Sequence, residues 1–325
     1  MVVKYMIDNN YISILVEDYI DFKKGLGFEL KICARRLRSF ASYTRSLDYT
    51  GYISKDIALK WCCMGTDSSK TKGRRLEMLR PFLQFAHIKN ENNEIIYNQI
   101  FPNVRKRPNP HIYTEEVLIL IEKCKELYSP DQLRIKSMQT VLGLLWSTGM
   151  RPNEVASLKY KDFDIENNLI KIHDTKLHKD RTIPIHESVS IKIKEYILFL
   201  NDHKIYPNEN DTLFYTTNQK PFSLSKIQYT FKLIRCGITH EDSEHTNVRL
   251  YDFRHSFASR TIYQWLNNKE DVNAKLYILS CYLGHSKPED TYWYLSSSIL
   301  LMDLVSNRYE KMVGDLKGVI VKIKS

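Results

Sequence analysis

The chain has 325 residues, which is enough for two domains that each bury a hydrophobic core. Hydrophobic residues make up 43% and charged residues 26%, as in ordinary globular proteins, and the apolar runs are too short to cross a membrane. The formal net charge of +10 points to a polyanionic partner such as nucleic acid.

The cysteines and the N-terminus indicate where the protein works. Six cysteines are scattered along the chain, with no CxxC pair and no ligand-like spacing to histidine. Such cysteines are typical of buried thiols in a reducing compartment and not of disulfides or a zinc site. The first residues also lack the basic-then-apolar pattern of a secretory signal. We therefore expect a cytoplasmic protein that needs no metal or other cofactor.

Positive charge is concentrated in the first third of the chain. Residues 1–108 hold 19 Lys and Arg against 11 Asp and Glu, whereas residues 109–325 hold 29 against 27. This asymmetry predicts that the first third is a module that holds DNA. The later part is nearly balanced in charge, so its function must depend on particular residues.

The first third is expected to be helical, with glycines between the helices. Apolar residues recur at helical spacing over 10–24, 28–46, 54–64 and 69–88. Either Ser68 or Ser69 is a candidate N-cap for the fourth of these helices.

Four cations then fall in the first turns of that fourth helix, where positive charge is unfavourable unless an anion neutralises it. A phosphate backbone would do so, and the alternative is a solvated basic face. The residues expected to contact DNA are Arg35, Arg36, Lys70, Lys72, Arg74 and Arg75, together with Arg105, Lys106 and Arg107 of the linker that follows this domain.

A linker separates the two predicted domains. Prolines at positions 102, 108 and 110 discourage helix on both sides of three consecutive cations. The domain boundary is therefore placed here, with a helical DNA-binding domain over residues 1–108 and a second domain over residues 109–325.

The second domain is expected to be mainly helical with a small sheet. Helices are predicted over about 114–128 and 134–146, and Pro152 stands where a new helix begins. Two β-type runs, 169–173 and 181–185, enclose a short polar hairpin tip. The chain is helical again from about residue 186, with a polar loop near 236–247. The fold class is thus mainly α with a small β-sheet, made of a helical N-terminal domain and an α+β catalytic domain.

Five places in this domain carry residues suited to phosphate chemistry. Each is commonplace by itself, since a lone arginine is usually a surface cation and a tyrosine among aromatics usually packs in a core. Their order along the chain is the specific signal. They are Arg151 with Glu154, Lys176 on the hairpin tip, Arg254-His255, His285 after a glycine, and Tyr294 on a helix that Ser286 and Glu289 could cap.

The order and spacing of these elements resemble those of the tyrosine recombinase (phage integrase) family, over nearly the whole chain. The matching segments are Thr148–Val155, Thr175-Lys176 with Lys179–Ile185, Tyr251–Ala258, Leu283–Ser286 and Asp290–Leu295. One position departs from the family, because Tyr251 stands where the second segment usually has histidine. Tyrosine can donate a hydrogen bond to phosphate, but its ordinary pKa of about 10 makes it a poor base.

The resemblance implies that DNA is cleaved and rejoined through a 3′-phosphotyrosine at Tyr294. It implies that Arg151 and Arg254 clamp the phosphate and that Lys176 protonates the leaving 5′ oxygen. His255 and His285 would position the phosphate, Tyr251 would donate to it, and Glu154 would orient Arg151 or a histidine.

The expected partner is double-stranded DNA, bound by a tetramer of identical or sister recombinases that integrates, excises or resolves a mobile element. The C-terminal tail, residues 316–325, is a candidate connector between protomers, and the alternative is that it docks on its own domain. Three alternatives stay open on the sequence alone: a type IB topoisomerase, a DNA-binding regulator that has lost catalysis, and a structural or interaction protein.

Overall fold

The computed structural model describes residues 9–101, 110–173, 180–236, 248–285, 287 and 289–297, with side chains described up to residue 294. The chain divides into two compact units, Met1–Arg107 and Pro108–Ser325, one residue from the boundary expected at the linker. None of the helices in the described ranges is long and apolar enough to span a membrane.

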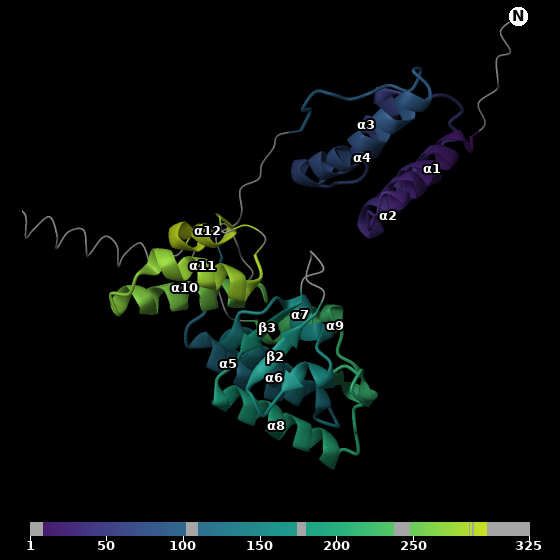
Figure 1. The fold of residues 1–325 in the computed structure, drawn as a ribbon. Helices are drawn as coiled ribbons and strands as arrows, with labels where there is room; N and C mark the ends of the chain where they lie inside the picture. The colour runs from purple at the N-terminus through teal and green to yellow at the C-terminus, as the bar shows by residue number, and fades with distance from the viewer. Residues whose placement is uncertain are drawn as a thin grey trace, which may run out of the picture. The chain divides into compact units, whose positions relative to one another are not determined.

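The N-terminal unit consists of helices, as predicted (Figure 1). Ser68 and not Ser69 is the N-cap of the fourth helix, because its hydroxyl accepts from the amide of Thr71. Such a cap is worth about 1 kcal/mol. The helices are α1 (Tyr11–Gly25), α2 (Lys31–Ser46), α3 (Lys55–Cys62) and α4 (Ser69–Lys89).

An aromatic cluster holds these helices together. Phe40 of α2 lies edge-on to Trp61 of α3 and to Phe82 of α4, with ring centroids 5.5 Å and 6.3 Å away. Phe40 and Phe82 are fully buried, and burial of each such side chain contributes roughly 1.5–3 kcal/mol. The helices that carry Arg35, Arg36 and the Lys70–Arg75 cations are therefore fixed by a core of their own.

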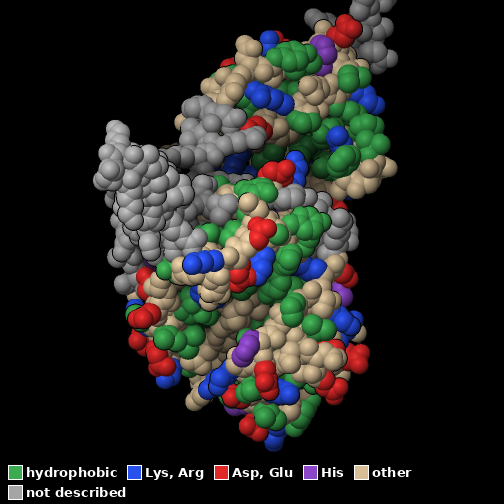
Figure 2. Space-filling view, turned by 60° about the vertical axis from the view of Figure 1, so that its left-hand side comes forward, with side chains coloured by type: hydrophobic (Ala, Val, Ile, Leu, Met, Phe, Trp, Pro, Cys, Tyr) green, Lys and Arg blue, Asp and Glu red, His purple; other side chains and the backbone are tan. Residues whose placement is uncertain are grey.

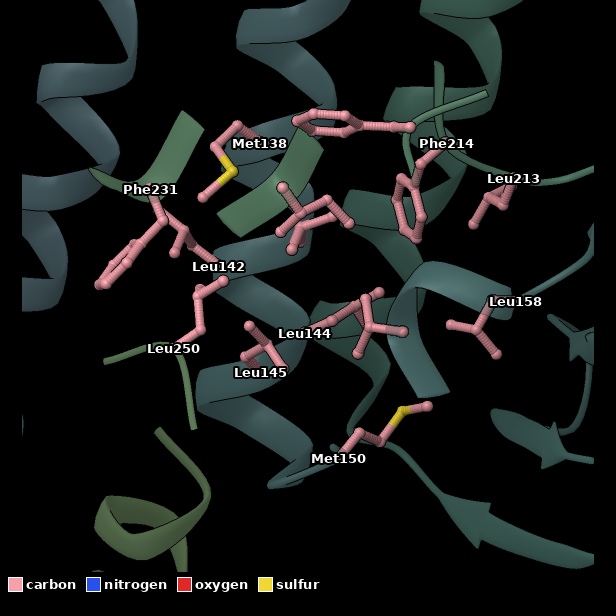
Figure 3. Packing of buried hydrophobic residues seen from close by; sticks show 14 of the residues in the cluster. Met138, Leu142, Leu144, Leu145, Met150, Leu158, Leu213, Phe214, Phe231 and Leu250 are labelled. Atoms are coloured by element: carbon pink, nitrogen blue, oxygen red, sulfur yellow. The ribbon is translucent and has the colours of Figure 1, made fainter. Parts of the chain in front are cut away.

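The C-terminal unit is built around α6 (Leu133–Thr148). Figure 3 shows buried side chains of α6 packed against Phe214, Phe231 and Leu250, which come from distant parts of the chain. The predicted helix over 114–128 is only partly correct, because it changes to 3₁₀ geometry at Cys124 and ends at Glu126, ahead of Pro130. The other helices are α5 (Glu116–Lys123), α7 (Pro152–Ser157), α8 (Glu187–Asp202), α9 (Leu224–Ile234), α10 (Asp252–Asn267), α11 (Val272–Leu283) and α12 (Glu289–Ser297).

The predicted hairpin is confirmed and is part of an antiparallel sheet. Strand β2 (Leu169–Ile172) pairs with β3 (Arg181–Pro184) so that Ile170 lies opposite Ile183, and both side chains are buried. The short β1 (Phe163–Asp164) adds a third strand on the other side of β2. A second sheet, β4 (Tyr215–Thr216) with β5 (Lys220–Pro221), was not predicted, because two-residue strands give no alternating pattern.

The last three helices form a separate core cluster that includes Tyr294. Asp271 caps the start of α11 by accepting from two backbone amides, and α11 is followed by its C-cap Gly284, whose φ is +66°. The tyrosine expected to be the nucleophile is thus packed against α10 and α11. On the face of this unit drawn in Figure 2, Lys and Arg side chains are interspersed with Asp and Glu, in line with its nearly balanced charge.

Candidate active site

Three guanidinium groups meet at the C-terminal end of α11. Arg181 Nε donates to the carbonyl of Tyr282 at 3.0 Å, and Arg151 Nη2 donates to the carbonyl of Gly284, also at 3.0 Å. Arg254 Nη2 donates to the carbonyl between them, that of Leu283. The last carbonyls of a helix have no partner inside it and carry partial negative charge. The three arginines supply those partners at the turn that leads to His285.

Glu154 joins two of these arginines. Its carboxylate accepts from Arg151 Nη1 at 2.7 Å, and from Arg181 Nη1 and Nη2 at 3.0 Å and 2.8 Å. The same carboxylate accepts from the backbone amide of Arg151 and so caps α7. Burial alone would raise the pKa of Glu154, but the bonds and charges of Arg181 and Arg151 lower that pKa to about 2. Glu154 is therefore ionised near neutral pH.

Two glycines make this convergence possible. Gly149 and Gly284 have φ values of +62° and +66°, a region that side chains disfavour. A Cβ on Gly149 would lie 2.5 Å from the ring of Phe257, and one on Gly284 would lie 2.8 Å from Arg181 Nη1. The Gly149 carbonyl also accepts from Arg254 Nη1 at 3.1 Å. Substitution of either glycine would displace an arginine or the helix that carries it.

Arg254 is fully buried beside Tyr294, which is itself only 3% exposed. Burial raises the pKa of the Tyr294 phenol, and the nearby Arg254 guanidinium opposes that rise. Burial and the positive charge of Arg151 lower the pKa of Arg254, but a guanidinium stays charged in proteins. A positive charge thus lies next to the phenol that would have to lose its proton.

The Tyr294 ring lies between two histidines. Its centroid is 5.3 Å from that of His255 and 5.9 Å from that of His285. His285 Nδ1 is 2.7 Å from the hydroxyl of Thr291. Burial, followed by the charges of Arg254 and Arg151, lowers the pKa of His285 to about 4. The imidazole is therefore neutral near pH 7 and carries a single ring proton.

Tyr251 lies at this site, in the position where the family usually has histidine. It is the N-cap of α10 and is 43% exposed, so it is accessible from solvent. Its ring is edge-on to His255, with centroids 5.3 Å apart. Its phenol also interacts with Arg151, where it helps Glu154 to raise the pKa of the guanidinium against the effect of burial.

The structure thus brings together most of the residues predicted to act in catalysis. Two residues at the site were missed by the sequence analysis, namely Arg181, which was read only as part of the closing strand, and Thr291. Lys176, Lys179, Ser286 and the linker cations Arg105, Lys106 and Arg107 lie outside the described residues, as does the tail. The residues brought together are Arg151, Glu154, Tyr251, Arg254, His255, His285 and Tyr294.

The cations predicted to contact DNA differ in how they are used. Arg35, Lys70 and Arg74 are exposed, and Arg36 and Lys72 are half-buried. Arg75 is the exception, because its guanidinium points inward. It donates to the carbonyls of Cys62 and Met64 at 3.2 Å and 2.9 Å and to Asp67. Arg75 is predicted from the sequence to contact DNA or to lie on a solvated face, whereas its contacts here are those of a residue that closes the end of α3.

In the described ranges, no group of three or more His, Cys, Asp and Glu side chains is arranged to hold a metal ion. The site offers the guanidiniums of Arg151 and Arg254, the second of which lies beside the phenol of Tyr294, together with the neutral imidazole of His285. That set can bind a phosphodiester, stabilise extra charge on its oxygens and present an oxygen nucleophile.

Sequence comparison with known proteins identifies relatives along most of the chain. The model of the phage integrase family matches residues 110–299. A Sinorhizobium fredii protein named as an integrase/recombinase, y4rE, is 28% identical over 295 residues, which cover 90% of this chain and 94% of that protein. The tyrosine recombinase XerD of Staphylococcus saprophyticus is 26% identical over 297 residues, or 86% and 92% of the two chains.

Solved structures share the fold. The integrase of the Tn1549 transposon, in complex with transposon right end DNA, aligns with a TM-score of 0.61 and 17% identity over 93% of this chain and 99% of that chain. The XerH site-specific recombinase bound to a palindromic difH substrate aligns with a TM-score of 0.58 and 19% identity over 85% and 78%.

Proposed function

We propose that this chain, which belongs to the phage integrase family, is a site-specific DNA recombinase. It would act through a 3′-phosphotyrosine at Tyr294. One observation carries the proposal: Arg151, Arg254 and His285 are held at the end of α11, where Arg254 and His285 adjoin the buried ring of Tyr294. These are the groups that a phosphodiester needs from a metal-independent strand transferase.

The proposed cleavage step is a transesterification. The Tyr294 oxygen attacks phosphorus, the bond from phosphorus to the 5′ oxygen breaks, and the 3′ phosphate stays on the tyrosine. The phenol proton leaves during attack, assisted by His255, and Lys176 gives a proton to the 5′ oxygen. Rejoining is the reverse step. It needs no external energy source, because the phosphotyrosine keeps the energy of the broken bond.

Charge stabilisation comes from the two clamp arginines. The non-bridging oxygens gain negative charge in the transition state, and forked guanidiniums can bind both of them. Arg151 and Arg254 already hold backbone carbonyls, so their orientation is set before substrate arrives. Neutral His285 and the exposed phenol of Tyr251 each have a proton to donate to a phosphate oxygen. Preorganised donors of this kind need little rearrangement during the reaction.

DNA binding by the N-terminal unit completes the proposal. Arg35, Arg36, Lys70, Lys72 and Arg74 contact the phosphate backbone, joined by the linker cations, and a tetramer forms on paired sites of a mobile element. Two structural neighbours, XerH with difH and the Tn1549 integrase with a transposon end, are complexes with DNA, which supports this role.

The test is covalent trapping on a nicked suicide substrate. Wild type is expected to form a protein–DNA adduct, and Tyr294→Phe is expected to bind the DNA and form none. Tyr292→Phe, which alters an exposed neighbour on the same helix, is the matched control and should keep the adduct. Loss of the adduct in Tyr292→Phe alone would move the nucleophile to that residue.

The same assay separates the other functions. A wild type that binds DNA and forms no adduct would be a regulator that has lost catalysis. A wild type that forms the adduct and relaxes supercoils without exchanging partner strands would be a type IB topoisomerase.

A further inference from the structure

Arg181 lies in the site with its side-chain nitrogens directed at other protein groups. Its side chain is 12% exposed, and three of its nitrogen atoms donate within the protein, Nε to the carbonyl of Tyr282 and both Nη atoms to Glu154. Arg151 divides its two Nη atoms between Glu154 and the carbonyl of Gly284. An arginine with all three nitrogens engaged in this way is suited to hold other residues and not to bind a phosphate.

We propose that Arg181 is a positioning residue of the strand transferase, which holds Glu154 and the end of α11 so that Arg151 and His285 are correctly placed around the phosphate. The inference rests on the proposed function and deepens it. Glu154 is shared between Arg151 and Arg181. One carboxylate faces two guanidiniums, so Glu154 cannot neutralise Arg151 completely. Without Arg181, Glu154 and Arg151 would form a closed ion pair, and the clamp would attract a phosphate less strongly.

The turn that leads to His285 is packed against the same guanidinium. Gly284 has φ +66°, and a Cβ there would lie 2.8 Å from Arg181 Nη1, so the turn is packed directly against this guanidinium. Arg181 also holds the carbonyl of Tyr282, two residues before Gly284. His285 follows the turn at once, and its ring stacks near that of Tyr294. A shift of Arg181 would therefore move His285 as well as Arg151.

The variant that tests this is Arg181→Lys, which keeps the positive charge and loses the fork that holds Glu154 and Tyr282 together. Arg181→Gln is the second variant, which loses the charge and keeps an amide donor. Arg134→Lys is the matched control, because Arg134 also links two elements of this unit, with Nε 3.0 Å from the hydroxyl of Thr230 on α9. Folding of each variant is checked by circular dichroism.

Cleavage is measured in a single turnover with protein in excess, and DNA affinity is measured separately. Arg181→Lys is expected to cleave ten to a hundred times more slowly, as a misplaced catalytic group does, with affinity within about twofold of wild type. Arg134→Lys should cleave at the wild-type rate. A substrate with sulfur in place of the leaving 5′ oxygen should be slowed by the same factor, because the defect lies in the clamp and not in protonation of the leaving group.

A double variant tests the route through Glu154. If Arg181 acts by holding that carboxylate, Glu154→Gln and Arg181→Lys should together slow cleavage by much less than the product of their separate effects. Multiplicative effects, wild-type cleavage by Arg181→Lys, or rescue of it by the sulfur substrate would each overturn the proposal while leaving the phosphotyrosine mechanism intact.

If wild type forms no adduct, the proposed function is rejected, and the role of Arg181 needs a measurement that does not depend on catalysis. A carbon-13 NMR titration of Glu154 would then show whether Arg181 holds this carboxylate. The pKa of Glu154 should rise in Arg181→Lys, because Arg181 is the largest influence that lowers it. An unchanged titration would show that Arg181 does not hold Glu154 in solution.

Discussion

In both units of the molecule an arginine closes the C-terminal end of a helix and pairs with a carboxylate. In the N-terminal unit, Arg75 donates to two carbonyls at the end of α3 and to Asp67. In the C-terminal unit, Arg181 donates to one carbonyl at the end of α11 and to Glu154. The two arginines are similarly buried, with 14% and 12% of the side chain exposed.

The carboxylates differ, and that difference separates a structural cluster from a functional one. Asp67 is 42% exposed, and its cluster ends at the surface. Glu154 is 6% exposed and binds a second arginine, Arg151, which reaches to the turn before His285. The same local chemistry therefore fixes a loop in one unit, and in the other it holds Arg151, which we propose to be part of a phosphate clamp. Substitutions in each cluster test whether the two differ in this way.

The largest expected effect is that of Arg254→Lys. Lysine cannot hold the carbonyls of Gly149 and Leu283 and also offer a fork to the phosphate. We expect single-turnover cleavage at saturating DNA to fall by about 10³-fold, in the range found when a preorganised oxyanion donor is removed. Cleavage within tenfold of wild type by a folded Arg254→Lys protein would show that Arg254 serves the fold and not the phosphate.

Glu154→Gln should change how stability depends on pH. The folded pKa of Glu154, about 2, lies below its ordinary value of 4.5. Its ionised form therefore stabilises wild type above pH 4.5, and this contribution is lost as the pH falls towards 2. The lost part is on the order of 3 kcal/mol of the free energy of unfolding. Urea unfolding between pH 7 and pH 2.5 measures it, and the Gln variant should show a flatter dependence.

Asp67→Asn is the matched control for that experiment. Because Asp67 is largely exposed, its ion pair with Arg75 is expected to contribute less than about 1 kcal/mol. The free energy of unfolding that acid removes should depend on Asp67 much less than on Glu154. If Asp67→Asn flattened the pH dependence as much as Glu154→Gln does, the two clusters would not differ in this respect.

Much of the fold and of the site could be predicted, because the signals are local or follow the chain in order. Apolar spacing gave the helices of the N-terminal unit to within a few residues, and the hydroxyl of Ser68 marks the start of α4. The order of motifs that resembles the family pointed to Arg151, Arg254, His285 and Tyr294, which do lie together. Of these, the first three stand next to a glycine turn or in the first turn of a helix.

What could not be predicted depends on contacts between residues distant in sequence. Arg181 lies 27 positions from Glu154 and 101 from the carbonyl of Tyr282, so nothing near it in the sequence reveals its partners. Arg75 looks like its cationic neighbours in sequence, and only the fold turns it inward. Strands β4 and β5 are too short to show a period of two.

A smaller effect is expected at the position that departs from the family. Tyr251→Phe removes the hydroxyl proposed to donate to the phosphate and should slow cleavage about tenfold, the value of one hydrogen bond to a charged group. Tyr251→His should cleave faster than the Phe variant. Its cleavage rate should depend on pH near 6.5, the ordinary pKa of histidine. A Phe variant as fast as wild type would show that Tyr251 only packs against His255.

The smallest effect is expected in the N-terminal unit, where exposed charges are screened by salt. Replacement of Lys70, Lys72 and Arg74 by alanine should flatten the plot of log affinity against log salt, by about 0.9 for each phosphate that the protein no longer neutralises. Arg75→Ala should leave that slope unchanged, because its guanidinium is engaged with Asp67 and two carbonyls. It should instead lower the free energy of unfolding by about 1 kcal/mol, since the part-buried carbonyl of Cys62 loses its donor.

The two measurements together decide which kind of cluster Arg75 belongs to. Fluorescence anisotropy over a range of salt concentrations gives the slopes, and urea unfolding gives the stabilities. A slope that falls in Arg75→Ala as much as in a single Lys70→Ala variant would mean that Arg75 leaves Asp67 to bind DNA. The arginine clusters of the two units would then both act on the substrate. A normal slope with reduced stability would keep Arg75 as the structural counterpart of Arg181.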